Sequence, residues 1–238
     1  GGVRRYYNSN GKVAHIFNSS GQFTVEGNKT LTHDTLDPFG DSSGIALWQF
    51  DGNANDKSGN YNGTASNVTF SQGYINDGGD FNGSNSYVST AHNTAFNLDS
   101  AGSFTLWVKR DGTGREWIFE KANGGSGTYS WQLYFYNGEY GFQMHNTSNG
   151  TITATSGTSG IATNTWEHIA VTCNGSKEYK LYFNGVLKST QTLSGTVANN
   201  TNGLTFGKYT LAGGYEFDGM IDQVRFFNKA LSASEVST

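Results

Sequence analysis

The sequence predicts an all-β protein, and both its composition and its pattern of short apolar runs indicate this class. It contains 33 glycines and one proline in 238 residues, of which 14% are aromatic and 14% charged. The apolar runs are separated by glycine, asparagine and serine, which is typical of many short strands joined by tight turns. Two Asn-Gly pairs, at 137–138 and 184–185, stand between such runs and predict two-residue hairpins.

Charge and cysteine content exclude several classes of function. The net charge is −4 and no run of lysine and arginine occurs, so the chain lacks the basic stripe that neutralises nucleic-acid phosphates. No apolar run approaches the length needed to cross a membrane. The single cysteine, Cys173, leaves no internal disulfide and no thiolate metal cluster, and we expect it to be buried and inert. We therefore expect neither a nucleic-acid partner nor membrane insertion.

The chain divides into a small and a large part. Residues 1–36 carry a short repeat, because the pattern at 7–13 returns ten positions later at 17–23, and each copy predicts a turn followed by a short strand. A unit this small cannot bury a core alone, so it packs on the large domain or pairs with copies in other chains. Residues 37–44, which hold the one proline, are predicted to be a linker, and residues 45–238 one large domain.

The hairpin at 131–145 is the most informative for function. Its Asn-Gly turn sets the register, so Tyr136 pairs with Glu139 and Phe135 with Tyr140. The face predicted to be core carries Trp131, Leu133, Phe135, Tyr140, Phe142 and Met144. The face predicted to bind a ligand carries Gln132, Tyr134, Tyr136, Glu139, Gln143 and His145. Aromatic rings beside hydrogen-bonding groups are typical of surfaces that stack on sugar rings and bind their hydroxyls.

Two acidic features suggest a cation. The run 217–227 predicts a closing strand that is inserted into an existing sheet, and its internal Asp222 lies among bulky apolar residues, where a carboxylate needs a partner. The loop after the strand at 45–50 places side-chain oxygens at alternate positions, at Asp51, Asn53 and Asn55, as in short loops that wrap hard cations. A loop of Asx-turns without any metal is the alternative.

Several segments in order resemble signatures of the laminin-G-like family, which has the concanavalin A-like fold. They cover residues 45–237 and include Phe81-Asn82-Gly83-Ser84-Asn85-Ser86-Tyr87-Val88, Trp166-Glu167-His168-Ile169-Ala170-Val171 and Gly219-Met220-Ile221-Asp222-Gln223-Val224-Arg225. The resemblance implies a two-sheet antiparallel jelly-roll sandwich, preceded here by the small β-rich N-terminal extension.

The resemblance also implies a structural Ca²⁺. Many relatives hold one such ion on the convex side, with a carboxylate of the closing strand and oxygens of the first loop, and by position these would be Asp222 and Asp51. Backbone carbonyls near Gly73 or Asp77 would complete the shell. The alternative is that Asp222 caps a turn or pairs with Arg225.

Glycosidases of this fold use two carboxylates across the glycosidic bond. The chain has no Glu-x-Asp-x-x-Glu run, and the nearest pair is Glu116 and Glu120, whose spacing predicts one shared strand face. No third acid supports this pair. We therefore predict a non-catalytic recognition or structural module that contacts a glycan or a surface protein, with a glycan-cleaving enzyme of degenerate motif as the alternative.

The N-terminal repeat resembles the β-rich stalk and connector segments of bacteriophage tail fibres, which are trimeric. That resemblance implies a homotrimer formed through residues 1–36 and a place on a virion or, more broadly, at an extracellular or cell surface.

Overall fold

The computed structural model describes residues 3–6, 13–16, 35–122, 129–158, 160–210 and 213–237. The chain forms two compact units, Gly1–Thr32 and His33–Thr238. In the first, β1 (Val3–Tyr6) pairs antiparallel with β2 (Val13–Ile16). The strand predicted after the first copy of the repeat therefore begins at Val13. The second copy, at 17–23, lies outside the described residues.

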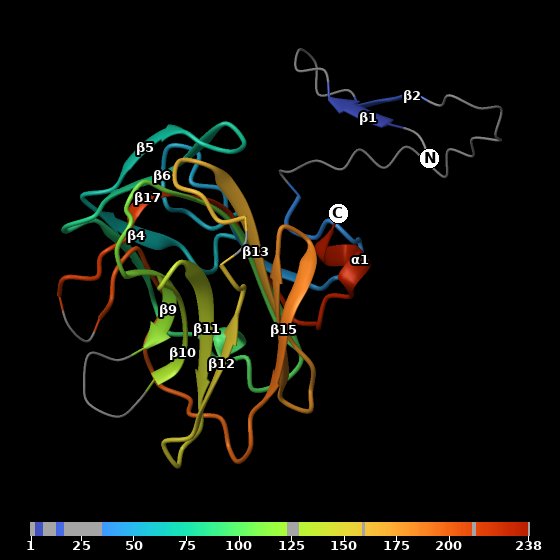
Figure 1. The fold of residues 1–238 in the computed structure, drawn as a ribbon, viewed down its shortest axis with the longest axis vertical. Helices are drawn as coiled ribbons and strands as arrows, with labels where there is room; N and C mark the ends of the chain where they lie inside the picture. The colour runs from blue at the N-terminus through green and yellow to red at the C-terminus, as the bar shows by residue number, and fades with distance from the viewer. Residues whose placement is uncertain are drawn as a thin grey trace. The chain divides into compact units, whose positions relative to one another are not determined.

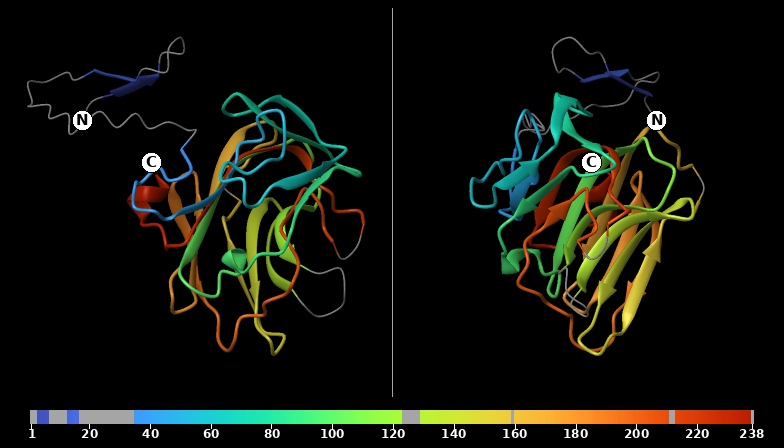
Figure 2. Two further views of the ribbon diagram at one scale, coloured as in Figure 1. Left: turned by 180° about the vertical axis from the view of Figure 1, so that it is seen from behind. Right: turned by 90° about the vertical axis from the view of Figure 1, so that its left-hand side faces the viewer.

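The second unit is a sandwich of two antiparallel sheets, as predicted (Figure 1). The seven-stranded sheet has the order β12 (Thr151–Thr155), β11 (Glu139–His145), β10 (Tyr129–Tyr136), β9 (Glu116–Ala122), β16 (Thr205–Phe206), β7 (Tyr87–Thr90) and β4 (Gly63–Ser66). The eight-stranded sheet has the order β15 (Val186–Thr192), β14 (Glu178–Phe183), β13 (Trp166–Cys173), β8 (Gly102–Arg110), β17 (Asp218–Phe227), β6 (Asp77–Asn82) and β5 (Thr69–Gln72), with β3 (Gly44–Trp48) also on β17. Figure 2 shows the two layers from other directions. Helix in the described residues is confined to η1 (Thr94–Phe96) and α1 (Ala233–Val236).

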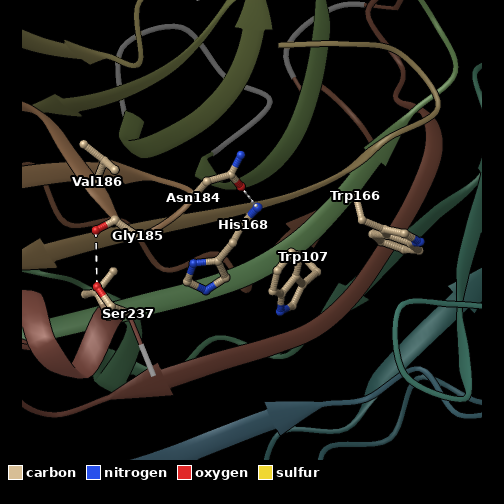
Figure 3. Close-up of a pocket in the computed structure, with 8 residues that line it drawn as sticks. Trp107, Trp166, His168, Asn184, Gly185, Val186 and Ser237 are labelled. Atoms are coloured by element: carbon tan, nitrogen blue, oxygen red, sulfur yellow. Dashed lines mark hydrogen bonds between the residues drawn. The ribbon is translucent and has the colours of Figure 1, made fainter. Parts of the chain in front are cut away.

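The predicted closing strand, β17, is the most connected strand of its sheet. It pairs with β8 along one edge, and along the other edge it pairs first with β6 and then with β3. The change of partner coincides with a register shift after Asp222 and with a left-handed backbone at Gln223, where φ is 50°. Its neighbour β8 also pairs with β13, so Trp107 lies opposite His168 on the outer face (Figure 3).

Aromatic rings fill the space between the sheets. Phe104 of one sheet stacks on Trp131 of the other with ring centroids 5.1 Å apart. Phe119 packs edge-on against both rings, and Phe226 packs against both at a tilt. The hairpin face predicted to be core lies inside this cluster, with every side chain at most 5% exposed. Each buried ring removes roughly 150–250 Å² from water, so these rings dominate the stability of the sandwich. Cys173 is also buried, and burial raises the pKa of its thiol to about 11.

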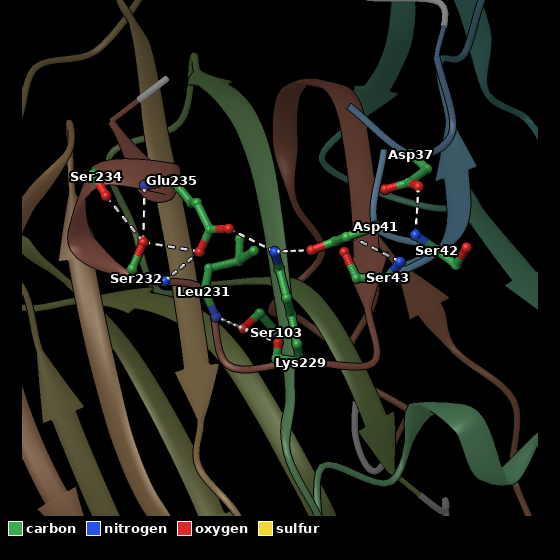
Figure 4. A network of polar contacts seen from close by, with 10 residues as sticks. All are labelled: Asp37, Asp41, Ser42, Ser43, Ser103, Lys229, Leu231, Ser232, Ser234 and Glu235. Atoms are coloured by element: carbon green, nitrogen blue, oxygen red, sulfur yellow. Dashed lines mark hydrogen bonds and ion pairs between the residues drawn. The ribbon is translucent and has the colours of Figure 1, made fainter. Parts of the chain in front are cut away.

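The segment predicted to be a linker, 37–44, packs on the sandwich. The ring of Phe39 contacts Phe227 with centroids 5.5 Å apart. Lys229 lies between Asp41 of this segment and Glu235 of α1, with its Nζ atom 2.5 Å from an oxygen of each (Figure 4). The division between the two units therefore falls before this segment, between residues 32 and 33.

Candidate functional site

A polar row crosses the outer face of the seven-stranded sheet from one edge to the other. In register, its members are Thr153, Gln143, Gln132, Glu120, Thr205, Ser89 and Thr64. Directly paired residues in neighbouring strands direct their side chains to the same side of a sheet. The adjacent positions, such as Leu133 and Phe142, point into the core. The row therefore presents hydroxyl, amide and carboxyl groups on the side that faces away from the core.

Hydrogen bonds hold the middle of this row. The Nε2 amide of Gln132 donates to Oε2 of Glu120 over 3.0 Å, and the backbone N–H of Thr210 donates to Oε1 over 2.8 Å. Glu120 is fully buried and Gln132 nearly so. Burial raises the pKa of the Glu120 carboxyl, against the lowering effect of the Thr210 and Gln132 donors. At the edge, Gln143 donates to the hydroxyl of Thr153 over 3.3 Å and remains half-buried.

An aromatic cluster, Trp117 with Tyr134, Tyr209 and Tyr215, lies beside the polar row. The Trp117 ring stacks on Tyr134 at 5.4 Å and contacts Tyr209 at 4.2 Å and Tyr215 at 5.3 Å between centroids. The Tyr134 ring packs flat over Gly141, where an added Cβ would lie 2.4 Å from the ring. Burial raises the pKa of Tyr134. The indole N–H of Trp117 is buried and has no hydrogen-bond partner in the described part of the chain.

Arg115 forms the exposed edge of this cluster. The central carbon of its guanidinium lies over the rings of Trp117, Tyr136 and Tyr215, at 4.3, 4.8 and 5.0 Å from their centroids. Tyr136 is 43% exposed. Three rings restrict the guanidinium and leave its N–H groups at the surface, which is an arrangement that can donate hydrogen bonds to a ligand.

The six residues predicted to bind a ligand share this outer face, and the predicted pairing of Tyr136 with Glu139 is confirmed. They differ in access, because Gln132 and Tyr134 are buried whereas Tyr136 is exposed. Glu139, Gln143 and His145 are half-buried. His145 Nδ1 lies 2.9 Å from the hydroxyl of Thr151, and burial lowers the pKa of His145 to about 4, so the ring is neutral at pH 7.

Four residues of the aromatic cluster and its exposed edge, Trp117, Arg115, Tyr209 and Tyr215, were not identified from the sequence. Arg115 lies in the connection between β8 and β9, and the two tyrosines lie in a glycine-rich segment about 90 residues further along. Their approach to Trp117 depends on long-range packing. The one local signal is the clustering of tyrosine and glycine at 207–215.

The prediction that Glu116 and Glu120 share one strand face is wrong. The pairing of β9 with β10 shifts register, so Glu120 lies opposite Gln132 while Glu116 lies opposite Phe135. An extra residue in one strand reverses the side to which the following residues point. Glu116 therefore points inward, where its Oε2 lies 2.8 Å from Nε of Arg110. Two carboxylates on opposite faces of a sheet cannot flank one glycosidic bond.

The two predicted metal ligands both hold the loop at 73–77. Asp222 is fully buried, and its Oδ2 accepts the N–H of Ile75 over 2.9 Å. Asp51 Oδ1 accepts the N–H of Asp77 over 3.0 Å. The Oδ1 atom of Asp222 is buried and has no hydrogen-bond partner among the described residues. Burial raises the pKa of Asp222 to about 7, and the nearby charge of Asp51 adds to the shift.

These residues fit a cation in part. An unpartnered buried carboxylate oxygen is a suitable ligand for Ca²⁺. No group of three or more His, Cys, Asp or Glu side chains in the described residues could hold a metal, so backbone oxygens would have to complete the shell. In the first loop, Asn53 accepts the N–H of Asn55 over 2.8 Å, which is the Asx-turn alternative. Arg225 donates to the carbonyl of Thr35 over 2.6 Å.

The chain belongs to the concanavalin A-like lectin/glucanases superfamily, whose family model matches residues 82–237. No curated protein sequence matches it. Among solved structures, it is similar to domain 4 of AbnA, an extracellular arabinanase from Geobacillus stearothermophilus solved with arabinotriose. That match has a TM-score of 0.64 and 21% identity, and covers 81% of this chain and 95% of the other.

Two toxin structures are similar as well. The binding domain of Paraclostridial Mosquitocidal Protein 1 matches with a TM-score of 0.67 and 21% identity, over 81% of this chain and 50% of that one. The botulinum neurotoxin serotype D domain solved with N-acetylneuraminic acid matches with a TM-score of 0.65 and 21% identity, over 81% and 49%. This chain thus spans about half the length of the toxin chains, and the likeness shows a shared fold. Among the described residues, neither η1 nor α1 has the length and apolar character of a membrane-spanning helix.

Proposed function

We propose that this chain is a non-catalytic recognition module that binds glycans through the outer face of the seven-stranded sheet. The observation that carries the proposal is the continuous polar row beside the cluster of Trp117, Tyr134, Tyr209 and Tyr215. The comparisons support it, because one similar domain was solved with arabinotriose and another with N-acetylneuraminic acid.

The accessible part of this face decides how a glycan would be held. Tyr136 and Arg115 offer a ring and a cation at the surface, and the half-buried Gln143 offers an amide further along the same face, four residues beyond Glu139, the partner of Tyr136. A sugar ring would stack on Tyr136, while Arg115 would donate hydrogen bonds to hydroxyl or carboxylate oxygens. Because Trp117 and Tyr215 already restrict Arg115, little side-chain entropy would be lost on binding.

Replacement of Tyr136 by alanine tests this proposal directly. We expect Tyr136→Ala and Arg115→Ala each to weaken a glycan hit from an array by about tenfold, about 1–2 kcal/mol, as measured by calorimetry. Leu187→Ala is the matched control, because Leu187 is 46% exposed but lies on the other sheet. An array without any glycan hit, or a hit that both variants bind normally, would contradict the proposal.

The alternative of glycan cleavage receives no support from the carboxylates. Glu116 points inward and forms an ion pair with Arg110. Glu120 is buried and accepts hydrogen bonds from Gln132 and Thr210. We therefore expect no turnover of arabinan or other polysaccharides. Hydrolysis that is lost in Glu120→Gln would show that the module is an enzyme.

We also propose that a structural Ca²⁺ binds between Asp222 and Asp51. The support is the buried Oδ1 atom of Asp222, together with the attachment of both carboxylates to the loop at 73–77. The ion would neutralise two acids that oppose each other's ionisation and would tie the closing strand to the first loop.

The setting of the module is a further part of the proposal. We infer that it is displayed on an extracellular or virion surface, at the end of a fibrous homotrimer that forms through residues 1–36. The support is the internal repeat and the hairpin of β1 with β2. Sedimentation of the full chain should give three times the chain mass, and a monomer at all concentrations would contradict the trimer.

A further inference from the structure

A pocket of about 620 Å³ lies on the outer face of the eight-stranded sheet, remote from the polar row. Strands β8 and β13, the turn at 184–185 and the end of α1 surround it (Figure 3). Trp107 and His168 are direct cross-strand partners, and Trp166 lies two residues before His168, so the three side chains point to the same side. The volume falls within the range of about 300–1,000 Å³ that is usual for small-molecule sites.

The aromatic part of the pocket is held in place from the side. The Trp107 ring stacks on Tyr74 with centroids 3.6 Å apart and planes 14° apart, and it contacts the His168 ring at 5.1 Å. The Trp166 ring meets Tyr74 edge-on at 5.9 Å. The residue after Tyr74 is hydrogen-bonded to the buried carboxylate of Asp222. Both tryptophans remain half-exposed, so ring surface is available to a ligand.

Polar groups that a ligand could reach stand beside these rings. Asn184 uses its Oδ1 to accept the backbone N–H of His168 over 2.8 Å, and its Nδ2 atom points away from that bond (Figure 3). Within the part of the chain that the structure describes, neither this Nδ2 atom nor the ring nitrogens of His168 have a hydrogen-bond partner. Burial lowers the pKa of His168 to about 4, so at pH 7 the ring offers one donor and one acceptor.

The charge of the pocket narrows the choice of ligand. No described residue that lines it is charged at neutral pH. One cation lies at its edge, because Lys109 is the cross-strand partner of Trp166 and its Nζ atom lies 5.8 Å from the centroid of that ring. An anion would find no cation among the described lining residues and could pair only with Lys109 at the edge. A purely apolar partner would bury the His168 ring nitrogens and the Asn184 amide without hydrogen bonds, at a cost of about 1–3 kcal/mol for each group. A neutral ring that carries hydroxyls would match both the tryptophan rings of the pocket and its polar groups on His168 and Asn184.

We propose that this pocket is a second binding site, which takes a neutral saccharide. The C–H face of one sugar ring would stack on Trp166 and Trp107, and its hydroxyls would bond the ring of His168 and the amide of Asn184. The two sites lie on opposite sheets, so the module would bind two glycan chains at once, or two parts of one branched chain. This inference stands apart from the proposed function, because it uses different residues.

The indole N–H signals of the full chain provide a test that separates the two sites. The chain has five tryptophans, of which Trp48 and Trp131 lie in the core, Trp117 reports on the seven-stranded face, and Trp107 and Trp166 report on the pocket. Signals assigned with Trp→Phe variants would be followed by NMR during titration with maltotriose, cellotriose and arabinotriose. We expect at least one trisaccharide to shift the Trp107 and Trp166 signals and to leave those of Trp48 and Trp131 in place.

Three variants complete the experiment. Trp166→Ala and His168→Ala should each weaken the shifts of the Trp107 signal about tenfold in Kd, whereas Tyr136→Ala should leave them unchanged. Unchanged titrations in Trp166→Ala and His168→Ala, or no shift of the Trp107 and Trp166 signals with any of the three trisaccharides, would overturn the second site. A shift at Trp117 alone would support the first site and reject the second, whereas shifts at Trp107 and Trp166 alone would support the second site and leave the first to the glycan array.

Discussion

The two outer faces of the sandwich are built by the same strand alternation but are covered differently. On the seven-stranded face, Glu120 and Gln132 are buried because Thr210 bonds to Glu120 and Tyr209 packs on Trp117. On the eight-stranded face, the main chain near Tyr74 covers Asp222, while Trp107 and Trp166 stay half-exposed. The pattern of a strand therefore decides which side chains face outward, whereas the loops decide which of them a ligand can reach.

The largest expected effect concerns the carboxylate under the loop of the eight-stranded face. The pKa of Asp222 is raised from 3.8 to about 7, so the folded protein keeps a proton that the unfolded chain has lost. Stability from this group is therefore fully present below about pH 4 and declines as the pH rises to about 7. With a chelator present, urea denaturation should show the free energy of unfolding of the wild type falling between about pH 4 and pH 7. That fall should be about 2–4 kcal/mol larger in the wild type than in Asp222→Asn, which lacks the titrating group.

Calcium should oppose that decline. If the ion binds as proposed, Ca²⁺ at pH 7 raises the Tm of the wild type and chelator lowers it again, because the ion binds the folded state alone. Asp222→Ala should remove the difference between the two conditions. A wild-type melting curve that is identical in Ca²⁺ and in chelator would contradict the proposed site.

The next effect concerns the packing of the seven-stranded face. In Gly141→Ala the new methyl group would lie 2.4 Å from the Tyr134 ring, so the ring and Trp117 above it must shift. We expect a loss of about 1–3 kcal/mol in unfolding free energy and weaker glycan binding. The saccharide titration of the Trp107 and Trp166 signals should be unchanged. Gly114→Ala is the control, because nothing lies near its position within 4 Å.

His145 in β11 of the seven-stranded sheet and His168 in β13 of the eight-stranded sheet allow a matched pair of variants. Burial lowers the pKa of both His145 and His168 from 6.5 to about 4. As the pH falls, the unfolded chain protonates these histidines near pH 6.5, before the folded protein does so near pH 4. The stability that the two neutral histidines contribute is therefore present above pH 6.5 and is lost as the pH falls toward 4. His145→Gln and His168→Gln should each reduce this acid loss by about 1–2 kcal/mol, discounted for their partial exposure. A histidine whose NMR titration midpoint is near 6.5 would contradict the prediction for that face.

The smallest effect compares two tyrosines of equal exposure. Tyr74 and Tyr136 are each 43% exposed, but Tyr74 stacks on Trp107 with centroids 3.6 Å apart. Tyr74→Ala should therefore cost about 0.5–1.5 kcal/mol more in unfolding free energy than Tyr136→Ala, as measured by denaturant midpoints. Tyr74→Ala should weaken the saccharide titration of the Trp107 and Trp166 signals more than Tyr136→Ala does. Tyr136→Ala should weaken the titration of the Trp117 signal more than Tyr74→Ala does. Equal stability of the two variants would show that the stack on Trp107 contributes no more than the contact of Tyr136 with Arg115.

Much of the fold followed from local pattern. The Asn-Gly turn and the alternation of the hairpin at 131–145 predicted its register and its buried face, because a two-residue turn leaves one way for the flanking residues to pair. The apolar pattern at 217–227 predicted a strand that is inserted into a sheet, and β17 indeed has paired strands along both edges. The linker at 37–44 was read from composition, and in the structure Phe39 and Asp41 attach it to the sandwich.

Local pattern was enough to predict the all-β class and which residues of the hairpin face outward, since both depend on neighbours a few positions apart, while the two-sheet sandwich was implied by the family resemblance. The faces on which the two glutamates lie, the ring cluster around Arg115 and the pocket followed only from tertiary structure. The register shift opposite Tyr134 placed Glu116 and Glu120 on opposite faces, and Arg115 met Tyr215 across about 100 residues. The pocket at Trp107 likewise joins β8 to the end of α1. Such contacts are selected by how whole sheets and loops pack, and no short stretch of the chain carries that information.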